Sequence, residues 1–251
     1  MYPNPDEDSI GFIIYTIYIQ KPTNKSLFDE STFETHLLVF DREKRSMATT
    51  RYLGINSIGF LSKRFKSIKY VYKEEDLFDL FVKAIQYYDP DVLVGFEIQK
   101  LSWCFLCRRA MRLNLNEFCN QISRLPKRKR ESVMRINVDR KQQNQPNSKQ
   151  KGNDVIPIPQ DLAIAGRVVL NLWRVFKSEI SLNIYTFENC CYHILKERNP
   201  KFSFGELNSW FSHKSDLYRW KTIDYYLYRA VANFKLMSRL DLVGKEFYLT
   251  S

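Results

Sequence analysis

Residues 88–103 read YDPDVLVGFEIQKLSW, and this stretch decides the fold. Its Asp89-Pro90 step ends a helix, because proline has no backbone N–H to donate and restricts the residue before it. The unbroken apolar run Val92–Phe96 predicts a short strand covered on both faces. Helical spacing of apolar residues resumes from Trp103 to Leu113. The stretch therefore predicts a buried strand between two helices, which is typical of an α/β domain.

Strand and helix patterns extend from this stretch in both directions. Upstream, β-branched and aromatic runs predict strands at residues 10–20, 36–41 and 68–72. Acidic residues at 74–76 suit the N-terminal end of a helix that ends before Asp89. Downstream, we expect a strand at 166–173 and helices at 186–197, 205–211 and 216–242. The fold class that follows is α/β, with a mixed β-sheet flanked by helices.

Composition limits the class of protein. The 251 residues are 44% hydrophobic, enough for one large domain or two small ones. No apolar run is long enough for a membrane span, and the acidic start MYPNPDEDS is unlike a signal peptide. Five cysteines, an odd number, favour a reducing compartment. Cys104 and Cys107 have the spacing of half a zinc site, but no second such pair accompanies them, so we interpret them as buried thiols.

The positive charge is concentrated in one segment. The chain carries a formal net charge of +11, and residues 124–151 hold ten Lys or Arg against two acidic residues, a net of +8. We interpret residues 124–158 as a basic, disordered insertion, because they contain few residues able to form a core. Within it, Lys127, Arg128, Lys129 and Arg130 are candidate contacts to nucleic acid or a nuclear-import signal. A solvated loop without either role is the alternative.

Several segments together resemble a known family. They are PNPDEDSIG near the start, DPDVLVGFEIQKLSW, and the segments at residues 166–195, 202–211 and 217–245. In this order they are similar to the exonuclease region of family B DNA polymerases, in particular to the translesion branch. The resemblance implies a ribonuclease H-like (DnaQ-like 3′–5′ exonuclease) fold over residues 1–245, without the strand of the first motif. It also implies a nuclear protein, and the tail 246–251 no longer resembles the family.

The resemblance also identifies where catalytic carboxylates should stand. Active members hold two magnesium ions with an Asp-x-Glu pair, an Asp in the second motif and an Asp four residues after a Tyr in the third. Here Glu97 and Ser102 occupy the Asn and Asp positions of the second motif. Tyr225 matches the third motif, and Arg229 stands in place of its Asp. We therefore predict no catalytic residue and no cofactor in this chain, with Mg²⁺ expected only in an active homologue.

Arg229 changes the expected chemistry of the third motif. A guanidinium is permanently cationic and only donates hydrogen bonds, so it repels a divalent ion. We predict that Arg229 pairs with Glu97 and fills the vacated metal site; the alternative is that each faces solvent.

Three functions remain open. The preferred one is an inert exonuclease-like domain that serves as scaffold and DNA-facing element, with DNA, the remaining polymerase domains and the accessory subunits as partners. The second is an active metal-dependent 3′–5′ exonuclease with unconventional ligands. The third is a basic nucleic-acid-binding adaptor that acts through residues 124–151. Because the chain ends at Ser251, before the palm domain of the family, we expect a fragment, an alternative transcript or a gene-model product.

Overall fold

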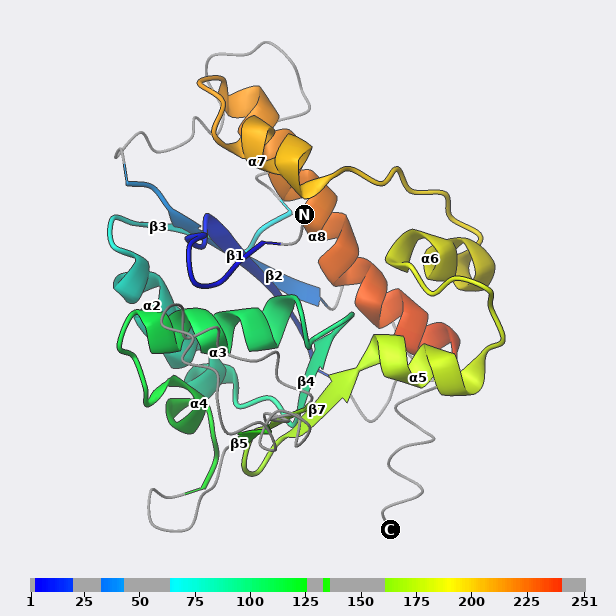
Figure 1. Ribbon diagram of the computed structural model, residues 1–251, viewed down its shortest axis with the longest axis horizontal. Coiled ribbons are helices and arrows are strands. Elements are labelled where there is room, and N and C mark those ends of the chain that lie inside the picture. Colours follow the sequence, from blue (N-terminus) through cyan, green and yellow to red (C-terminus); the bar gives the residue numbers. More distant parts are fainter. Residues whose placement is uncertain (1–2, 20–32, 43–63, 126–132, 136–160, 241–251) are drawn as a thin grey trace, which may run out of the picture. The chain divides into compact units, whose positions relative to one another are not determined.

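The computed structural model describes residues 3–19, 33–42, 64–125, 133–135 and 161–240, and the statements below concern these residues. They form two compact units. The first contains residues 9–81 together with the segment from Leu172 onward, and the second contains residues 4–8 and 82–171. In sequence, the first unit therefore consists of one stretch before and one stretch after most of the second unit, which can be followed by the colours of Figure 1.

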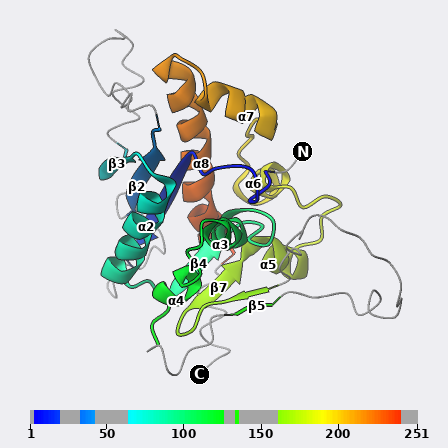
Figure 2. The same ribbon diagram turned by 60° about the vertical axis from the view of Figure 1, so that its left-hand side comes forward.

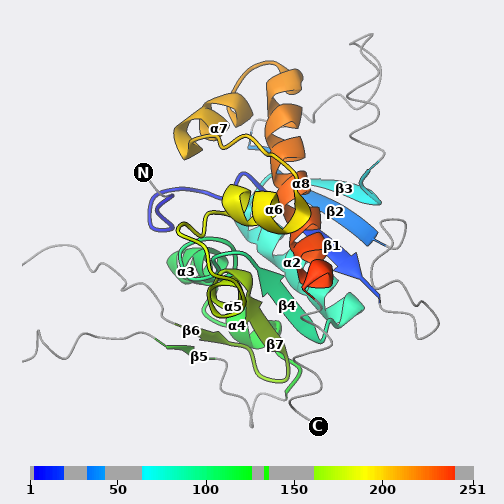
Figure 3. The same cartoon turned by 90° about the vertical axis from the view of Figure 1, so that its right-hand side faces the viewer.

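The first unit contains a three-stranded sheet in the order β1-β2-β3. Strand β1 (Phe12–Tyr18) runs antiparallel to β2 (Phe33–Phe40), and β2 runs parallel to β3 (Ser67–Val71). The three strands lie side by side in Figure 3. Central strand β2 has five consecutive buried residues, as expected for a strand covered on both faces.

Helices lie against both faces of this sheet (Figure 2). On one face, Trp220, Ile223 and Leu227 of α8 (Asp216–Arg239) form a buried cluster with alternate residues of β2, Leu37 and Val39. Their spacing in α8 places the three side chains on one stripe of the helix. On the other face, the ring of Tyr15 lies 5.6 Å from that of Phe81 in α2 (Glu74–Tyr88).

Three further helices complete the first unit, namely α5 (Leu172–Glu179), α6 (Phe187–Leu195) and α7 (Phe204–Phe211). Thr186 caps α6 by accepting a hydrogen bond from the backbone N–H of Asn189. Ser203 and Glu206 form a reciprocal capping box at α7. Local sequence therefore defines where both helices begin.

The second unit contains two small two-stranded sheets. Strands β4 (Val92–Gly95) and β7 (Val168–Asn171) pair in parallel, whereas β5 (Val133–Arg135) and β6 (Asp161–Ala163) pair antiparallel. Helices α3 (Ser102–Arg112) and α4 (Phe118–Gln121) belong to the same unit. Asp6, in the N-terminal turn of the second unit, forms an ion pair with Arg112 of α3. The hydrogen bond from Arg112 lowers the pKa of Asp6.

The expected α/β class is confirmed, but the single mixed sheet is not: β1, β2 and β3 form the mixed sheet, and β4 and β7 pair in a separate one. One strand boundary is also corrected. The strand expected at residues 166–173 ends at Asn171, and Leu172 already begins helix α5. Leu172 and Phe176 are buried one helical turn apart, so the apolar run that predicts one long strand includes residues of a helix. Of the predicted insertion 124–158, residues 126–132 and 136–160 lie outside the described residues, and 133–135 form β5. Among the described helices, none is both long and apolar enough to cross a membrane.

Candidate functional site

The second motif is a tight turn at the end of β4. Glu97 and Ser102 both have left-handed backbone conformations, with φ of 54° and 48°. Gly95 permits the close packing of this turn, because a Cβ atom there would lie 2.7 Å from Ile98 and 3.0 Å from the hydroxyl of Ser102. The indole N–H of Trp103 donates to the carbonyl of Val94 at 3.1 Å and ties α3 to the strand. The turn is thus a defined structure without a ligand Asp.

Two polar side chains of this region lack partners among the described residues. The Oε1 atom of Glu97 is buried and has no hydrogen bond to a described residue. The Nδ2 and Oδ1 atoms of Asn171 are likewise buried and have no such hydrogen bond. Asn171 is only 7% exposed and lies opposite Gly95 in the register of β4 and β7. Buried polar groups are normally hydrogen-bonded, so Glu97 and Asn171 mark a polar position within otherwise apolar surroundings.

The third motif lies in the first unit, on α8. Tyr225 and Arg229 are one helical turn apart, and the Nη1 atom of Arg229 donates to the hydroxyl of Tyr225 at 3.1 Å. The same nitrogen donates to Oε1 of Glu188 on α6 at 2.6 Å, which makes an ion pair. The side chains of Arg229 and Glu188 are 23% and 15% exposed, so water screens this pair only partly.

Aromatic rings enclose the guanidinium of Arg229. The guanidinium carbon lies 4.1 Å from the ring centroid of Phe187 and 5.5 Å from that of Tyr225, which places it in cation–π contact with the first ring. Burial raises the pKa of the neighbouring Tyr226 to about 12 and that of Cys191 to about 12. Both groups therefore stay neutral, and Glu188 supplies the negative charge opposite Arg229.

A second cation lies over aromatic rings beside α7. The ammonium of Lys221 is 4.0 Å from the ring centroid of Trp210, and Trp210 packs edge-on against Phe202 at 4.7 Å. Phe202 in turn contacts Tyr225 at 5.4 Å between centroids. The surroundings of the third motif are therefore mainly aromatic, and the carboxylate of Glu188 is paired with Arg229, whereas a metal site requires several convergent anionic oxygens.

The predicted pairing of Arg229 with Glu97 is not seen within either unit. Arg229 belongs to the first unit and Glu97 to the second, so the fold of neither unit defines their distance. Glu188 is instead the carboxylate that Arg229 contacts within its own unit. The pairing with Glu97 stays a prediction.

Magnesium does not fit the residues present at the two motifs. Ser102 offers a neutral hydroxyl, and Arg229 offers a cation already bound to Glu188, where the ion would need carboxylates. Over the part of the chain that the structure describes, no three His, Cys, Asp or Glu side chains gather as a metal site.

The predicted nucleic-acid contacts Lys127, Arg128, Lys129 and Arg130 lie outside the described residues. Just before them, Arg124 forms ion pairs with Asp89 at 2.8 Å and with Asp91 at 2.6 Å. The hydrogen bond from Arg124 lowers the pKa of Asp89. The ion pairs of Asp89 and Asp91 with Arg124 therefore connect the turn before β4 to the residue that follows α4 by a short stretch of chain.

Sequence reasoning missed Glu188 and Asn171. Glu188 lies in the first turn of α6, where an acidic residue already has a local explanation in the helix dipole. Its partner Arg229 is 41 residues away, and no local pattern links the two. Asn171 is a polar residue at the end of an apolar run, which is a usable signal for a buried polar position at the edge of the sheet.

Comparison with known proteins gives the family. Residues 60–189 match the family described as DNA polymerase family B, exonuclease domain. The chain is 36% identical over 249 residues to the DNA polymerase zeta catalytic subunit of Mus musculus, covering 98% of this chain and 7% of the relative. The corresponding subunit of Homo sapiens is 34% identical, over 97% of this chain and 7% of the relative.

A more distant relative gives the same result. The DNA polymerase zeta catalytic subunit of Saccharomyces cerevisiae is 26% identical over 97% of this chain and 14% of the relative. The chain thus spans well under a fifth of the length of these relatives. By its match over residues 60–189 and its likeness to these subunits, the chain belongs to the exonuclease-domain family of family B DNA polymerases.

Proposed function

We propose that the chain is a non-catalytic exonuclease-like domain of a translesion DNA polymerase of the zeta catalytic-subunit type. In this role it serves as scaffold and DNA-facing element in DNA damage tolerance in the nucleus, with a ribonuclease H-like fold. The family match and the likeness to zeta subunits along nearly the whole chain support the assignment. Its partners are then DNA, the remaining polymerase domains and the accessory subunits of the complex.

The ion pair between Arg229 and Glu188 is the observation that supports loss of catalysis. A proofreading exonuclease needs a carboxylate at the position of Arg229 to hold a divalent metal. The guanidinium instead has its own carboxylate 2.6 Å away and an aromatic ring under its face. In this arrangement Arg229 places a positive charge where a metal ligand would have to be anionic, and Glu188 is already engaged as its partner.

A lesion-extending polymerase has a physical reason to lack this activity. Such an enzyme elongates mismatched or damaged primer ends, and an active exonuclease would remove those same ends. Retaining the fold while losing the metal ligands keeps the scaffold and removes the competing hydrolysis.

Hydrolysis of a labelled primer tests this proposal. The purified chain is incubated with a 5′-labelled single-stranded primer in Mg²⁺ or Mn²⁺, beside Glu97→Ala and the matched surface variant Lys100→Ala. We expect no metal-dependent shortening above the buffer blank for any of the three proteins. Metal-dependent release of nucleotides by the parent chain and Lys100→Ala, but not by Glu97→Ala, would establish an active exonuclease instead.

A further inference from the structure

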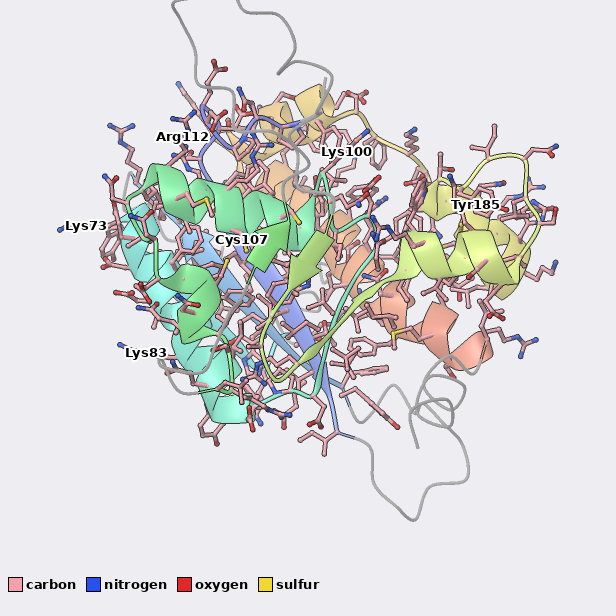
Figure 4. All side chains as sticks on the ribbon, turned by 60° about the horizontal axis from the view of Figure 1, so that its bottom comes forward. Lys73, Lys83, Lys100, Cys107, Arg112 and Tyr185 are labelled. Carbon is pink, nitrogen blue, oxygen red and sulfur yellow. The ribbon has the colours of Figure 1, made fainter. Side chains whose placement is uncertain are left out.

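Two thiols of the second unit lie together although they come from different helices. Cys107 belongs to α3 (Figure 4) and Cys119 to α4, and their Sγ atoms are 3.1 Å apart. A disulfide bond is about 2.0 Å long, so the sulfur atoms need to approach by only about 1 Å to bond. Both cysteines are free thiols in the structure.

The two thiols differ in access. Cys107 is 1% exposed, whereas Cys119 is only partly buried. A small oxidant therefore reaches Cys119 first, and Cys107 lies behind it. The other thiol of α3, Cys104, is fully buried one turn earlier on the helix.

We propose that Cys107 and Cys119 form an oxidative modification site, at which a hydroperoxide converts the dithiol to an intramolecular disulfide. The thiolate of Cys119 attacks the hydroperoxide, the O–O bond breaks, and Cys119 becomes a sulfenic acid while an alcohol or water leaves. The sulfur of Cys107 then displaces the hydroxyl group, which departs with the thiol proton as water. The dithiol loses two electrons and two protons overall, and the hydroperoxide is reduced.

The electrostatics of the pair favour this order of events. The hydrogen bond with Cys107 lowers the pKa of Cys119, despite an opposing effect of burial. The hydrogen bond with Cys119, followed by burial, raises the pKa of Cys107. Cys119 is therefore the thiol that ionises first and reacts first, because the thiolate is the nucleophile.

The modification would restrain the start of the basic segment. Helix α4 is short, and the chain continues from it through Ile122, whose carbonyl accepts a hydrogen bond from Arg167 at 2.7 Å, to Arg124. A bond from Cys119 to α3 adds a covalent anchor next to these polar ones. Disulfides in reducing compartments are transient and are used in sensing, which agrees with one partly exposed and one buried thiol.

Peptide mapping after oxidation tests the proposal. The reduced full chain is treated with hydrogen peroxide, its remaining thiols are blocked with a maleimide, and the chain is digested with trypsin. We expect two of the five thiols to be lost. Mass spectrometry should then find peptide 101–108, with one maleimide on Cys104, joined to peptide 113–124. The joined species should be two hydrogen masses lighter than the sum of these two peptides and should be separated again by dithiothreitol.

Variants identify the bonded pair. Cys104→Ser should retain the joined peptides, whereas Cys107→Ser should lose them and leave Cys119 as a sulfenic acid that a dimedone probe traps. The proposal is overturned if the parent chain gives no joined peptides under peroxide, or if Cys107→Ser still gives them. Detection in the parent chain does not depend on how well either variant folds.

Discussion

The contacts of Arg229 can be tested by measuring the free energy of unfolding. Its guanidinium binds Glu188 and Tyr225 and lies over Phe187, so one side chain connects α6 to α8. A charge-assisted hydrogen bond of this kind contributes roughly 1.5–3 kcal/mol net. The same contacts explain why the position tolerates a cation where the family expects an anion.

Replacing Arg229 with Ala should therefore lower the free energy of unfolding by about 2–3 kcal/mol, because Glu188 loses its partner while remaining largely buried. Urea unfolding followed by circular dichroism measures the change. Arg239→Ala is the matched control, since Arg239 is an exposed arginine at the end of the same helix, and it should change stability by less than about 0.5 kcal/mol. Equal losses in the two variants would contradict the structural role of the ion pair.

His36 gives a pH-dependent prediction at the same scale. The residue is 5% exposed, its ring stacks on Tyr15 at 4.9 Å, and its Nδ1 atom lies 2.7 Å from the hydroxyl of Ser67. Burial lowers its pKa below 6.5, the lysines at 66 and 69 lower it further, and Glu34 opposes them. The unfolded chain therefore binds the proton more readily than the folded one. The contribution of neutral His36 to the free energy of unfolding is fully present above about pH 6.5. It is lost as pH falls from there through the pKa of the folded state.

Unfolding curves between pH 7 and pH 5 should therefore show a fall in stability that is smaller in His36→Gln. His193→Gln, at an exposed histidine of α6, serves as the control and should keep the slope of the parent chain. The explanation fails if both variants keep that slope.

At the scale of elements, local sequence is a good guide to helices and a poor guide to the ends of strands. The sequence predicts that helix α2 begins with residues 74–76 and ends before Asp89, and the helix spans Glu74–Tyr88. The acidic first turn and the Asp-Pro step are local signals that no tertiary contact overrides. The pattern does not predict helix α5, since α5 begins at Leu172, directly after the last residue of β7, and apolar residues occur on both sides of that boundary.

The candidate site is only partly predictable for a related reason. The resemblance to family B exonucleases is what assigns Glu97, Ser102, Tyr225 and Arg229 to motif positions, because each motif is short and continuous in sequence. The contacts of Arg229 with Glu188 and of Cys107 with Cys119 join separate elements, 41 and 12 residues apart. Such pairs follow from packing, which a single sequence does not encode in any local pattern.

A substitution at Gly95 tests how tightly the turn after β4 is packed. Gly95→Ala should cost about 1–3 kcal/mol, since the new Cβ atom would lie 2.7 Å from Ile98 and 3.0 Å from Ser102. Gly205→Ala is the matched control: a Cβ there meets nothing within 4 Å, and alanine in α7 should stabilise by up to about 1 kcal/mol. Thermal unfolding should separate the two variants in opposite directions. A neutral Gly95→Ala would mean that the turn is not as tightly packed as described.

At the scale of the whole molecule, the net charge is carried mainly by one segment of the sequence rather than being spread along the chain. Residues 124–151 carry +8 of the net charge of +11. If this segment binds DNA, changing Lys127, Arg128, Lys129 and Arg130 to Gln should weaken binding to single-stranded DNA at low salt. It should also reduce the slope of log K against log salt by about 0.7 for each phosphate group that the protein no longer neutralises.

A matched surface variant controls for total charge. The control variant removes the same charge elsewhere, by Gln substitutions at four lysines that are exposed in the structure: Lys73, Lys83, Lys100 and Lys201. Three of these four positions are labelled in Figure 4. Their salt slope should stay close to that of the parent chain, and equal effects of the two sets would indicate attraction by net charge alone.

Direct measurement of metal binding shows whether the two motif regions hold a divalent ion, which we expect they do not. Titration of Mn²⁺ into the full chain, with free Mn²⁺ followed by electron paramagnetic resonance, tests this expectation directly. Glu97→Gln and the exposed control Glu117→Gln are titrated in parallel. We expect no saturable site at submillimolar Mn²⁺ and superimposable curves for the three proteins. A saturable site in the parent chain and in Glu117→Gln that disappears in Glu97→Gln would contradict it.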